Sequence, residues 1–465
     1  MHTKDLTTGS PMKLILSFML PLVFGLLFQQ VYSMVDTIVV GKFLGVDALA
    51  GVGSTGSITF LVLGLCNGVC AGFAIPVAQK FGQRDFDGLR RFVGSMIWLG
   101  GVIPAAGRGV TTLLCRQILL WMDTPADTFS YAYDYIFVIF LGIPATMLYN
   151  LLSGILRSLG DSKTPLVFLI MCSLLNVALD IVFILTLNMG VAGAGWATLL
   201  SQLISGVLCL YFIVKKFPIL HLKQDDLRLR KIYVRKLLNM GLPMGLQYSI
   251  TAIGSIMLQS ANNALGTDCV AAFTAMPAIA AGSRVSMLLV CPFDAMGTTA
   301  ATFAGQNLGA GKLDRIHQGV KDCTVLGIII SAAIFVITWF GGSAMTTLFL
   351  DTADGASVDM VGPVGQQFLI INAAFAIPLL FVNLLRFTIQ GLGYSEFAVF
   401  AGVFEMVARG AFGLCLVPVL GYTAACFASP AAWVMADLFL FPAYFHCMKK
   451  QGYSFKPTKA SAATE

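Results

Sequence analysis

The sequence predicts an all-α polytopic membrane protein with twelve transmembrane helices, arranged as two six-helix bundles related by an internal repeat. Three observations predict this fold. Of the 465 residues, 57% are hydrophobic and 11% are charged, with a mean hydropathy of +0.83. A soluble protein of this size has too little interior to bury that much apolar surface. The apolar residues fall into twelve long runs, and the second half of the chain repeats motifs of the first.

Each apolar run is long enough to cross the hydrocarbon core of a bilayer, which takes about 20 helical residues. We expect helices because lipid offers no partner for an unpaired backbone N–H or C=O group. The predicted spans are 14–38, 47–75, 92–114, 130–156, 164–187, 190–214, 237–262, 269–300, 322–349, 364–390, 394–417 and 421–447. Many further runs follow the first one, which indicates a retained span and not a cleaved signal peptide.

The Lys and Arg residues predict which side of the membrane each loop faces. Most of the 29 lie before span 1, after the even-numbered spans or in the C-terminal tail, with the densest group in 215–236. Such loops face the cytoplasm. We therefore expect a multi-pass protein of a prokaryotic cytoplasmic membrane with both termini inside. The net charge of +6 then reflects topology and not nucleic-acid binding.

Several motifs recur in the second half of the chain. LPLVFG at 20 corresponds to LPMGLQ at 242, and a Q-x-x-G motif occurs at 79 and again at 306. IPATMLYNLLSGILRSLG at 143 parallels IPLLFVNLLRFTIQGLG at 377. Transporters commonly consist of such repeats, with the working site between or within the halves. We expect an N-terminal six-helix lobe in 1–214, a basic cytoplasmic linker in 215–236, a C-terminal six-helix lobe in 237–449 and a cytoplasmic tail in 450–465.

Span 1 carries one acid in an otherwise uncharged run. Gln29, Ser33 and Asp36 are spaced i, i+4 and i+7, so they share one helix face. Pro21, fifteen residues before Asp36, lacks a backbone N–H and is expected to bend the helix. An acid within a span costs about 2.5 kcal/mol or more. Asp36 therefore either lies in water at the outer end of span 1 or has a functional role inside the membrane.

Spans 5 and 6 carry polar residues with a matching spacing. Asn176 and Asp180 are four residues apart, as are Thr198 and Gln202, so each pair shares a helix face. Carboxylate, amide and hydroxyl oxygens are hard donors that suit Na⁺ or proton exchange. The predicted cation-coupling site comprises Asp36, Asn176, Asp180 and Thr198, with Gln29, Ser33, Asn150, Ser153 and Gln202 as further candidates. The alternative is that Asn176 and Asp180 form a polar clamp that only holds helices together.

The C-terminal half has no acid at the position that matches span 1. Instead, Glu405 and Arg409 are four residues apart in span 11. They form either an intrahelical ion pair or a gate, with Glu405 as a second coupling acid. Arg284 of span 8 either lines the cavity or pairs with Glu405. Asp294 and Asp437 either hold helices together or face the cytoplasm.

Three stretches carry a resemblance to a known family. They are LTTGSPMKLILSFMLPLVFGLLFQQVYSMVDTIVVGKFLG near the N-terminus, the repeated Q-x-x-G and RSLGDSKTP after span 4. In this order they resemble the multidrug and toxic-compound extrusion (MATE) transporters over essentially the whole chain. That resemblance implies two six-helix bundles arranged as a V, and export of mostly cationic drugs in exchange for Na⁺ or H⁺.

The resemblance is closer to the DNA-damage-inducible and archaeal branch of that family. In that branch, an Asp on helix 1, an Asn-x-x-x-Asp pair on helix 5 and a Thr on helix 6 form a cation site in the N-terminal lobe. The matching residues here are Asp36, Asn176, Asp180 and Thr198. Another branch uses a Glu on helix 7 and an Asp on helix 10, and this chain lacks both.

Other functions fit the sequence less well. A lipid-linked oligosaccharide flippase of the same superfamily would need a cavity rich in Arg and Lys, and only Arg108, Arg284 and Arg409 are candidates. The span 5 pair does not fit a major-facilitator exporter, and no catalytic pair or channel filter is visible. No Gly-rich phosphate loop is present, so an ion gradient is the expected driver. We expect a monomeric, non-enzymatic antiporter in contact with membrane lipid, with a small cationic or amphipathic substrate, no nucleic-acid partner and no cofactor besides the coupling ion Na⁺ or H⁺.

Overall fold

The computed structural model describes residues 4–122, 124–264, 272–349 and 358–455, and within these ranges it contains helices and no β-strand. The α-helices are α1 (Pro11–Leu44), α2 (Val46–Ser54), α3 (Gly56–Gly82), α4 (Phe86–Trp121), α5 (Phe129–Leu141), α6 (Ile143–Ser158), α7 (Lys163–Ile181), α8 (Gly190–Lys216), α9 (Lys231–Ala264), α10 (Ala272–Gly309), α11 (Leu313–Thr347), α12 (Val358–Ala374), α13 (Ala376–Gly391), α14 (Ser395–Ala411), α15 (Val417–Leu420) and α16 (Tyr422–Lys450). The π-helices are η1 (Val182–Thr186) and η6 (Phe412–Leu416), and the 3₁₀-helices are η2 (Pro218–Leu220) and η3 (Gln224–Leu227). Residues 269–271 of predicted span 8 and residues 456–465 of the predicted tail lie outside the described ranges.

The predicted all-helical, polytopic architecture is confirmed. In the described part of the chain, nine helices are long and apolar enough to span a membrane, or eleven if each of the bent pairs α5–α6 and α12–α13 is one span. The predicted span that this count leaves out is α9. Its 34 residues reach about 50 Å, but Lys231, Arg235, Lys236 and several amides and hydroxyls lower its hydropathy.

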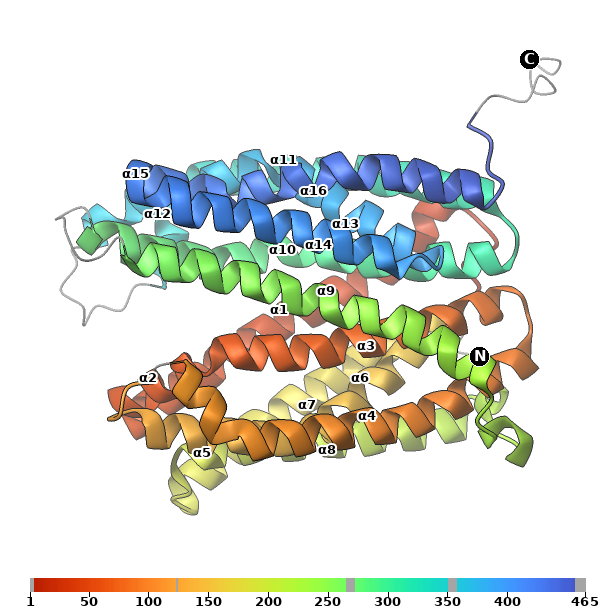
Figure 1. Cartoon of the computed structure of the whole chain (residues 1–465), viewed down its shortest axis with the longest axis horizontal. Coiled ribbons are helices and arrows are strands. Elements are labelled where there is room, and N and C mark those ends of the chain that lie inside the picture. Colours follow the sequence, from red (N-terminus) through yellow and green to blue (C-terminus); the bar gives the residue numbers. More distant parts are fainter. Residues whose placement is uncertain (1–3, 123, 265–271, 350–357, 456–465) are drawn as a thin grey trace.

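The helices form two bundles, α1–α8 and α9–α16, which lie one above the other in Figure 1. Helix α9 packs against α3 along the seam between the bundles. Glycines make this approach close: a Cβ atom at Gly68 or Gly72 of α3 would collide with the backbone of α9 near Gly245 and Gly241. Such small residues let helix backbones approach in membrane proteins.

The two bundles share unusual backbone features at corresponding places. The α5–α6 pair bends by 47° and the α12–α13 pair by 49°. Gly160 (φ +82°) follows α6 and Gly393 (φ +96°) follows α13, in a left-handed conformation that favours glycine. A π-helix begins at Val182, just after α7, and another at Phe412, just after α14. These paired deviations support the repeat predicted from the sequence.

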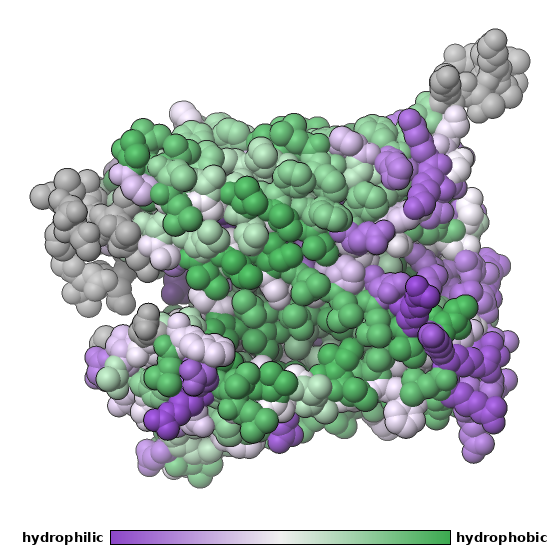
Figure 2. Space-filling view, in the orientation of Figure 1, coloured by the Kyte–Doolittle hydropathy of each residue, from purple (hydrophilic) through white to green (hydrophobic). Residues whose placement is uncertain are grey.

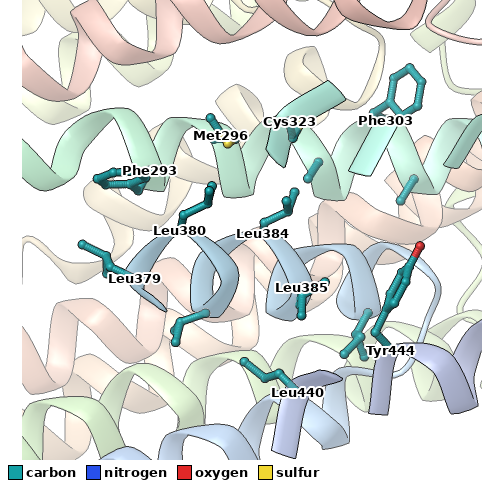
Figure 3. Packing of buried hydrophobic residues seen from close by; sticks show 14 of the residues in the cluster. Phe293, Met296, Phe303, Cys323, Leu379, Leu380, Leu384, Leu385, Leu440 and Tyr444 are labelled. Atoms are coloured by element: carbon teal, nitrogen blue, oxygen red, sulfur yellow. The ribbon is translucent and has the colours of Figure 1, made fainter. Parts of the chain in front are cut away.

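Large apolar side chains fill the core of the C-terminal bundle. Figure 3 shows Phe293 and Met296 of α10 near Leu380 and Leu384 of α13, with Leu440 of α16 on the other side of α13. These side chains are buried. Inside a bilayer they stabilise the bundle mainly by van der Waals packing, because lipid tails are as apolar as they are. A second cluster fills the N-terminal bundle with side chains of α3–α6 and α8.

Helix α1 belongs to both bundles. Ile15 and Phe18, from its first half, are part of the C-terminal core cluster. Val39 and Val40, from its second half, pack with residues of η1 and α8 in the N-terminal bundle. Pro21 lies inside the helix near the end of the first region, which extends through Leu22. A bend at Pro21 would therefore move one bundle relative to the other.

Hydrophilic side chains gather at the end of the molecule where α16 ends and the described chain begins, as Figure 2 shows at its right-hand edge. We call this end the basic end, after the Lys and Arg residues at the ends of α3, α8 and α16 and the start of α4. The segment that follows α8 is held here against α4. Arg90 Nε lies 3.3 Å from Asp226 Oδ2, and Trp98 Nε1 donates to the Leu227 carbonyl at 2.9 Å.

Candidate functional site

Asp36 of α1 and Asp180 of α7 face each other inside the N-terminal bundle. Helices α1 and α7 pack together, and the two carboxyl groups are near enough to interact electrostatically. Asp180 is fully buried, and neither of its carboxyl oxygens has a donor. Asp36 Oδ1 is also buried without a partner. Two adjacent carboxylates in a low dielectric cannot both stay ionised without a cation.

More oxygen acceptors surround the pair. Asn176 lies one turn before Asp180, is 1% exposed, and donates from Nδ2 to Thr198 Oγ1 at 3.3 Å. That bond aims the Asn176 carbonyl oxygen elsewhere, and this oxygen has no donor. The side-chain carbonyl oxygen of Gln202, one turn after Thr198, is also buried and also has no donor. Unsatisfied buried acceptors are costly, so a proton or a hard cation at this position would relieve several of them at once.

The N-lobe cavity lies beside these residues. It has a volume of about 140 Å³ and is lined by α1, α3 and α5–α8. Its lining includes four predicted candidates, Gln29, Asn150, Thr198 and Gln202. It also includes polar residues absent from the sequence prediction, which are Tyr32, Asn67, Thr146, Tyr149 and Ser173. Ser33 and Ser153 are not part of this lining: Ser33 is exposed, and Ser153 is buried in α6.

Two tyrosines next to the acid pair were missed by the sequence analysis. Tyr32 of α1 and Tyr135 of α5 interact electrostatically with both Asp36 and Asp180. Tyr32 lies one helical turn before Asp36, a spacing that could have identified it. Tyr135 comes from a different helix and offers no such signal.

The predicted Glu405–Arg409 pair is present in the C-terminal bundle, but the structure adds a third member. Arg409 Nη2 lies 3.5 Å from Glu405 Oε2, and Arg386 of α13 makes an ion pair with Glu405 Oε1. All three side chains are buried. Arg386 lies near the end of predicted span 364–390, and its side chain is buried. Arg284 is exposed, and Arg386 and Arg409 are the ion-pair partners that the structure gives Glu405, so its predicted pairing with Arg284 was wrong.

The triad gives a testable order of stabilities. Glu405→Gln leaves two buried guanidinium groups without an acid, whereas Glu405→Gln/Arg409→Gln leaves one. Breaking a buried ion pair on one side typically costs about 3–5 kcal/mol because it leaves an uncompensated charge. We therefore expect the double variant to unfold at a higher temperature than the single variant in a thermal unfolding assay in detergent. A single variant at least as stable as the double variant would show that the triad lacks this role.

A larger cavity occupies the C-terminal bundle. It has a volume of about 420 Å³, with apolar walls that include Phe293 and Trp433. Arg409 and Asp294 also line it, and Asp294 makes no ion pair with the described residues. Asp294 therefore faces a cavity, and no described partner indicates a helix-holding role for it.

The basic end holds the two bundles together through the repeated Q-x-x-G motif. A Cβ atom at Gly82 would collide with the Gln306 carbonyl, and one at Gly309 would collide with the Gln79 carbonyl, so α3 and α10 cross in direct backbone contact. Gln79 Nε2 donates to the Gly391 carbonyl at 3.1 Å. We call Gln79, Gly82, Gln306 and Gly309 the interlobe latch.

The residues before α1 reinforce the latch by joining both bundles. Lys4 N donates to the Leu159 carbonyl of the N-terminal bundle at 3.1 Å. Leu6 N donates to Gln306 Oε1 at 3.0 Å, and Arg315 Nη1 donates to the Gly9 carbonyl at 2.9 Å. The basic end is therefore closed in this structure.

The described residues contain no group of three or more His, Cys, Asp or Glu side chains arranged to hold a metal ion. The acid pair has only two such members. Its other oxygens are amide and hydroxyl groups, which suit Na⁺ or a proton better than a transition metal.

The chain is similar to known transporters in sequence and in fold. Probable multidrug resistance protein YpnP of Bacillus subtilis is 29% identical over 397 residues, which cover 84% of each chain. Multidrug export protein MepA of Staphylococcus saprophyticus is 22% identical over 414 residues, which cover 87% of this chain and 89% of its own. A structure described as the outward-facing conformation of a multidrug resistance MATE family transporter superimposes with a TM-score of 0.88 and 21% identity, over 97% of this chain and 98% of its own.

The family model for MatE matches residues 21–182 and 273–414, which cover most of both bundles and include the helices that carry Asp36 and Asp180. The match extends through α14 and so also includes Glu405 and Arg409. The chain therefore belongs to the MatE family, and as such it is a membrane transporter and not an enzyme.

Proposed function

We propose that this chain exports cationic or amphipathic compounds in exchange for Na⁺ or H⁺. Its relatives that are named multidrug resistance and multidrug export proteins support efflux as the activity. The observation that carries the ion-coupled mechanism is the pair of facing carboxyl groups of Asp36 and Asp180, whose buried oxygens lack donors. The coupling site comprises Asp36, Asn176, Asp180 and Thr198.

The site would couple ion entry to drug exit through its charge. Without a cation, the two carboxylates repel each other and leave buried acceptors unsatisfied. Entry of Na⁺ or a proton cancels one of the two negative charges, which removes the repulsion and brings α1 and α7 together. Coupling requires that the ion and the drug favour different conformations of the protein. The drug therefore leaves as the ion enters.

Helix α1 is the element that would transmit this change. Asp36 lies in its second half, which packs in the N-terminal bundle, whereas Ile15 and Phe18 in its first half pack against the C-terminal bundle. Pro21 lies between Phe18 and Asp36 and supplies a place to bend, because it breaks one backbone hydrogen bond. Neutralising Asp36 would then shift one bundle against the other and open the latch.

The Lys and Arg residues also indicate how the protein is oriented in the membrane. The Lys and Arg residues at the basic end support a cytoplasmic location for this end, with both termini inside. The latch then closes the cytoplasmic side in this structure, and α1–α8 and α9–α16 act as the two lobes of a monomer.

The flippase alternative is not favoured by the placement of its candidate residues. Arg108 and Arg284 are exposed on α4 and α10. Arg409 lines a cavity, but Glu405 holds its guanidinium group. A pyrophosphate would need several free cations converging on one cavity, and these three do not converge.

Drug efflux from a transporter-deficient bacterium tests the proposal. Cells that express the chain should export ethidium, a permanent cation, faster than cells that carry the empty vector. Everted membrane vesicles should show the same transport when a pH or Na⁺ gradient is imposed, and collapsing that gradient should stop it. Membrane-inserted protein that gives no efflux of ethidium under either gradient would contradict the proposed function.

A further inference from the structure

An arginine without an acidic partner lines the seam between the two bundles. Arg157 lies in the last turn of α6, next to the basic end of the bundle. It begins the RSLGDSKTP stretch and was counted with the loop after span 4 in the sequence analysis, but the structure places it inside the helix. Among the described residues, none forms an ion pair with Arg157, and its guanidinium group donates no hydrogen bond to them.

The acid nearest in the sequence is already engaged. Asp161, four residues after Arg157, caps the start of α7. Its Oδ1 accepts from Lys163 N at 3.1 Å and from Thr164 N at 3.0 Å, and its Oδ2 accepts from Thr164 Oγ1 at 2.6 Å. The ionisable side chains that do interact with Arg157 are tyrosines and cysteines, including Tyr149 and Tyr248, which are neutral at pH 7. The positive charge therefore has no counter-charge among the residues that the structure describes.

Arg157 lines a cavity that both bundles enclose, which we call the interlobe cavity. Its volume is about 230 Å³, and its walls come from α1, α3 and α6 on one side and α9, α10 and α13 on the other. Gln29, Asn67 and Asn150 add amide groups, and Tyr248 adds a hydroxyl group. The rest of the wall is mostly apolar, with Leu22, Leu26 and Phe387 among the larger side chains.

These features together indicate a ligand. An unpaired cation inside a membrane bundle is costly and is retained where it meets a substrate or an ion. A guanidinium group binds a carboxylate with two parallel hydrogen bonds, and amide N–H groups add further donors. Ligand pockets typically have volumes of about 300–1,000 Å³, so the interlobe cavity fits the anionic end of an amphipathic ligand and not all of a drug-sized molecule.

We propose that Arg157 binds a carboxylate group of transported substrates in the interlobe cavity, so that zwitterionic amphipathic compounds are preferred over their esterified, purely cationic analogues. The proposal rests on the proposed efflux function and specifies part of its substrate class. The location is informative, since the carbonyl of Ser158, the next residue, accepts from Gln306 Nε2 of the latch at 2.8 Å. A ligand bound to Arg157 thus lies directly beside the contact that closes the basic end.

Two dyes that differ in one group test this site. Rhodamine 110 has a free carboxylate, and rhodamine 123 is its methyl ester. Binding to the purified, full-length protein is measured by fluorescence polarisation in detergent. We expect wild type to bind rhodamine 110 more tightly than rhodamine 123. Arg157→Gln should lower the affinity for rhodamine 110 at least about tenfold, the size of one strong charge-assisted interaction, while the affinity for rhodamine 123 stays the same or rises.

Further variants separate binding from folding. Arg157→Lys keeps the positive charge but loses the planar guanidinium group that makes two parallel hydrogen bonds to a carboxylate. This variant should retain part of the preference for rhodamine 110. Arg116→Gln removes an exposed arginine of α4 and should change neither affinity. Because Arg157 has no acidic partner to lose in the described part of the chain, Arg157→Gln should unfold at a temperature no lower than wild type in the absence of dye. A structural ion pair would show the opposite shift.

The contradicting results are equally distinct. No wild-type preference for rhodamine 110, or an equal loss of both dyes in Arg157→Gln, would overturn the proposal. An anionic lipid headgroup is the other source of a suitable oxyanion. If phosphatidylglycerol in nanodiscs removes the preference for rhodamine 110 and inorganic phosphate does not, Arg157 binds a lipid headgroup. The assignment of the site to a substrate carboxylate is then wrong. Protein that binds rhodamine 110 through Arg157 but moves neither dye under a gradient refutes the proposed function and leaves the site standing.

Discussion

Asp180→Asn is expected to abolish gradient-driven drug efflux while leaving the protein folded in the membrane. The neutral amide cannot exchange a proton and offers one weak oxygen ligand in place of a carboxylate, so the site loses its ability to respond to an ion. Coupling between two ligands typically amounts to about 5–150-fold in affinity, and losing it should reduce ethidium efflux from energised cells by a factor in this range. The initial efflux rate, normalised to the amount of protein in the membrane, is the measurement.

Asp134→Asn is the matched control for this substitution. Asp134 is an exposed acid of α5 in the same bundle, so the same chemical change there should leave efflux at the wild-type rate. Asp180 has no donor to lose, so Asp180→Asn should not reduce the amount of membrane-inserted protein. Wild-type efflux from both Asp36→Asn and Asp180→Asn would eliminate these residues as the coupling acids.

Gly309→Leu should also reduce efflux, because its larger side chain prevents close contact between the two bundles. The added side chain would collide with the Gln79 carbonyl where α3 and α10 cross. Overpacking of this kind destabilises the closed conformation by about 1–3 kcal/mol. The fraction of molecules whose basic end is closed should therefore fall about 5–150-fold. Transport needs both ends to close in turn, so efflux should fall accordingly. Gly82→Leu should have the same effect, because Gly82 makes the reciprocal contact with Gln306.

The reactivity of a cysteine placed at the latch distinguishes an open basic end from misfolding. A cysteine introduced at the buried position Ser158 should resist a membrane-impermeant maleimide in the parent protein and react with it in Gly309→Leu when the basic end is exposed to the reagent. Gly101→Leu is the control, because Gly101 is exposed on α4 and a Cβ atom there meets no neighbour. Equal labelling in the parent and in Gly309→Leu would argue against a latch.

Much of the fold could be predicted from the sequence because a bilayer imposes simple rules on helix length and hydropathy. The Q-x-x-G motif and the matched asparagines Asn150 and Asn383 located corresponding helices in the two bundles, α3 with α10 and α6 with α13. Asp36, Asn176 and Asp180 were identified by polarity and spacing on single helices. The structure adds the fact that these residues face one another across two helices, which a pattern within one helix cannot predict.

Residues at the ends of apolar runs were the harder cases. Arg157 follows predicted span 130–156 and Arg386 lies near the end of predicted span 364–390, so hydropathy alone gave no sign that both face the protein interior. Helix spacing offered a signal: Arg157 is seven residues after Asn150, and Arg386 is three after Asn383, so each shares a face with an inward polar residue. The pairing of Arg386 with Glu405 joins α13 to α14 and depends on tertiary packing alone.

The most direct test of ion coupling at the acid pair uses purified protein in liposomes, with ethidium transport measured in two modes. In the first mode an inward pH or Na⁺ gradient drives accumulation, and in the second labelled ethidium exchanges against unlabelled ethidium without a gradient. The account predicts that Asp180→Asn retains exchange and loses the response to either gradient, because the drug site remains and the ion site does not. Gradient-driven accumulation by Asp180→Asn and Asp36→Asn at the wild-type rate would contradict it.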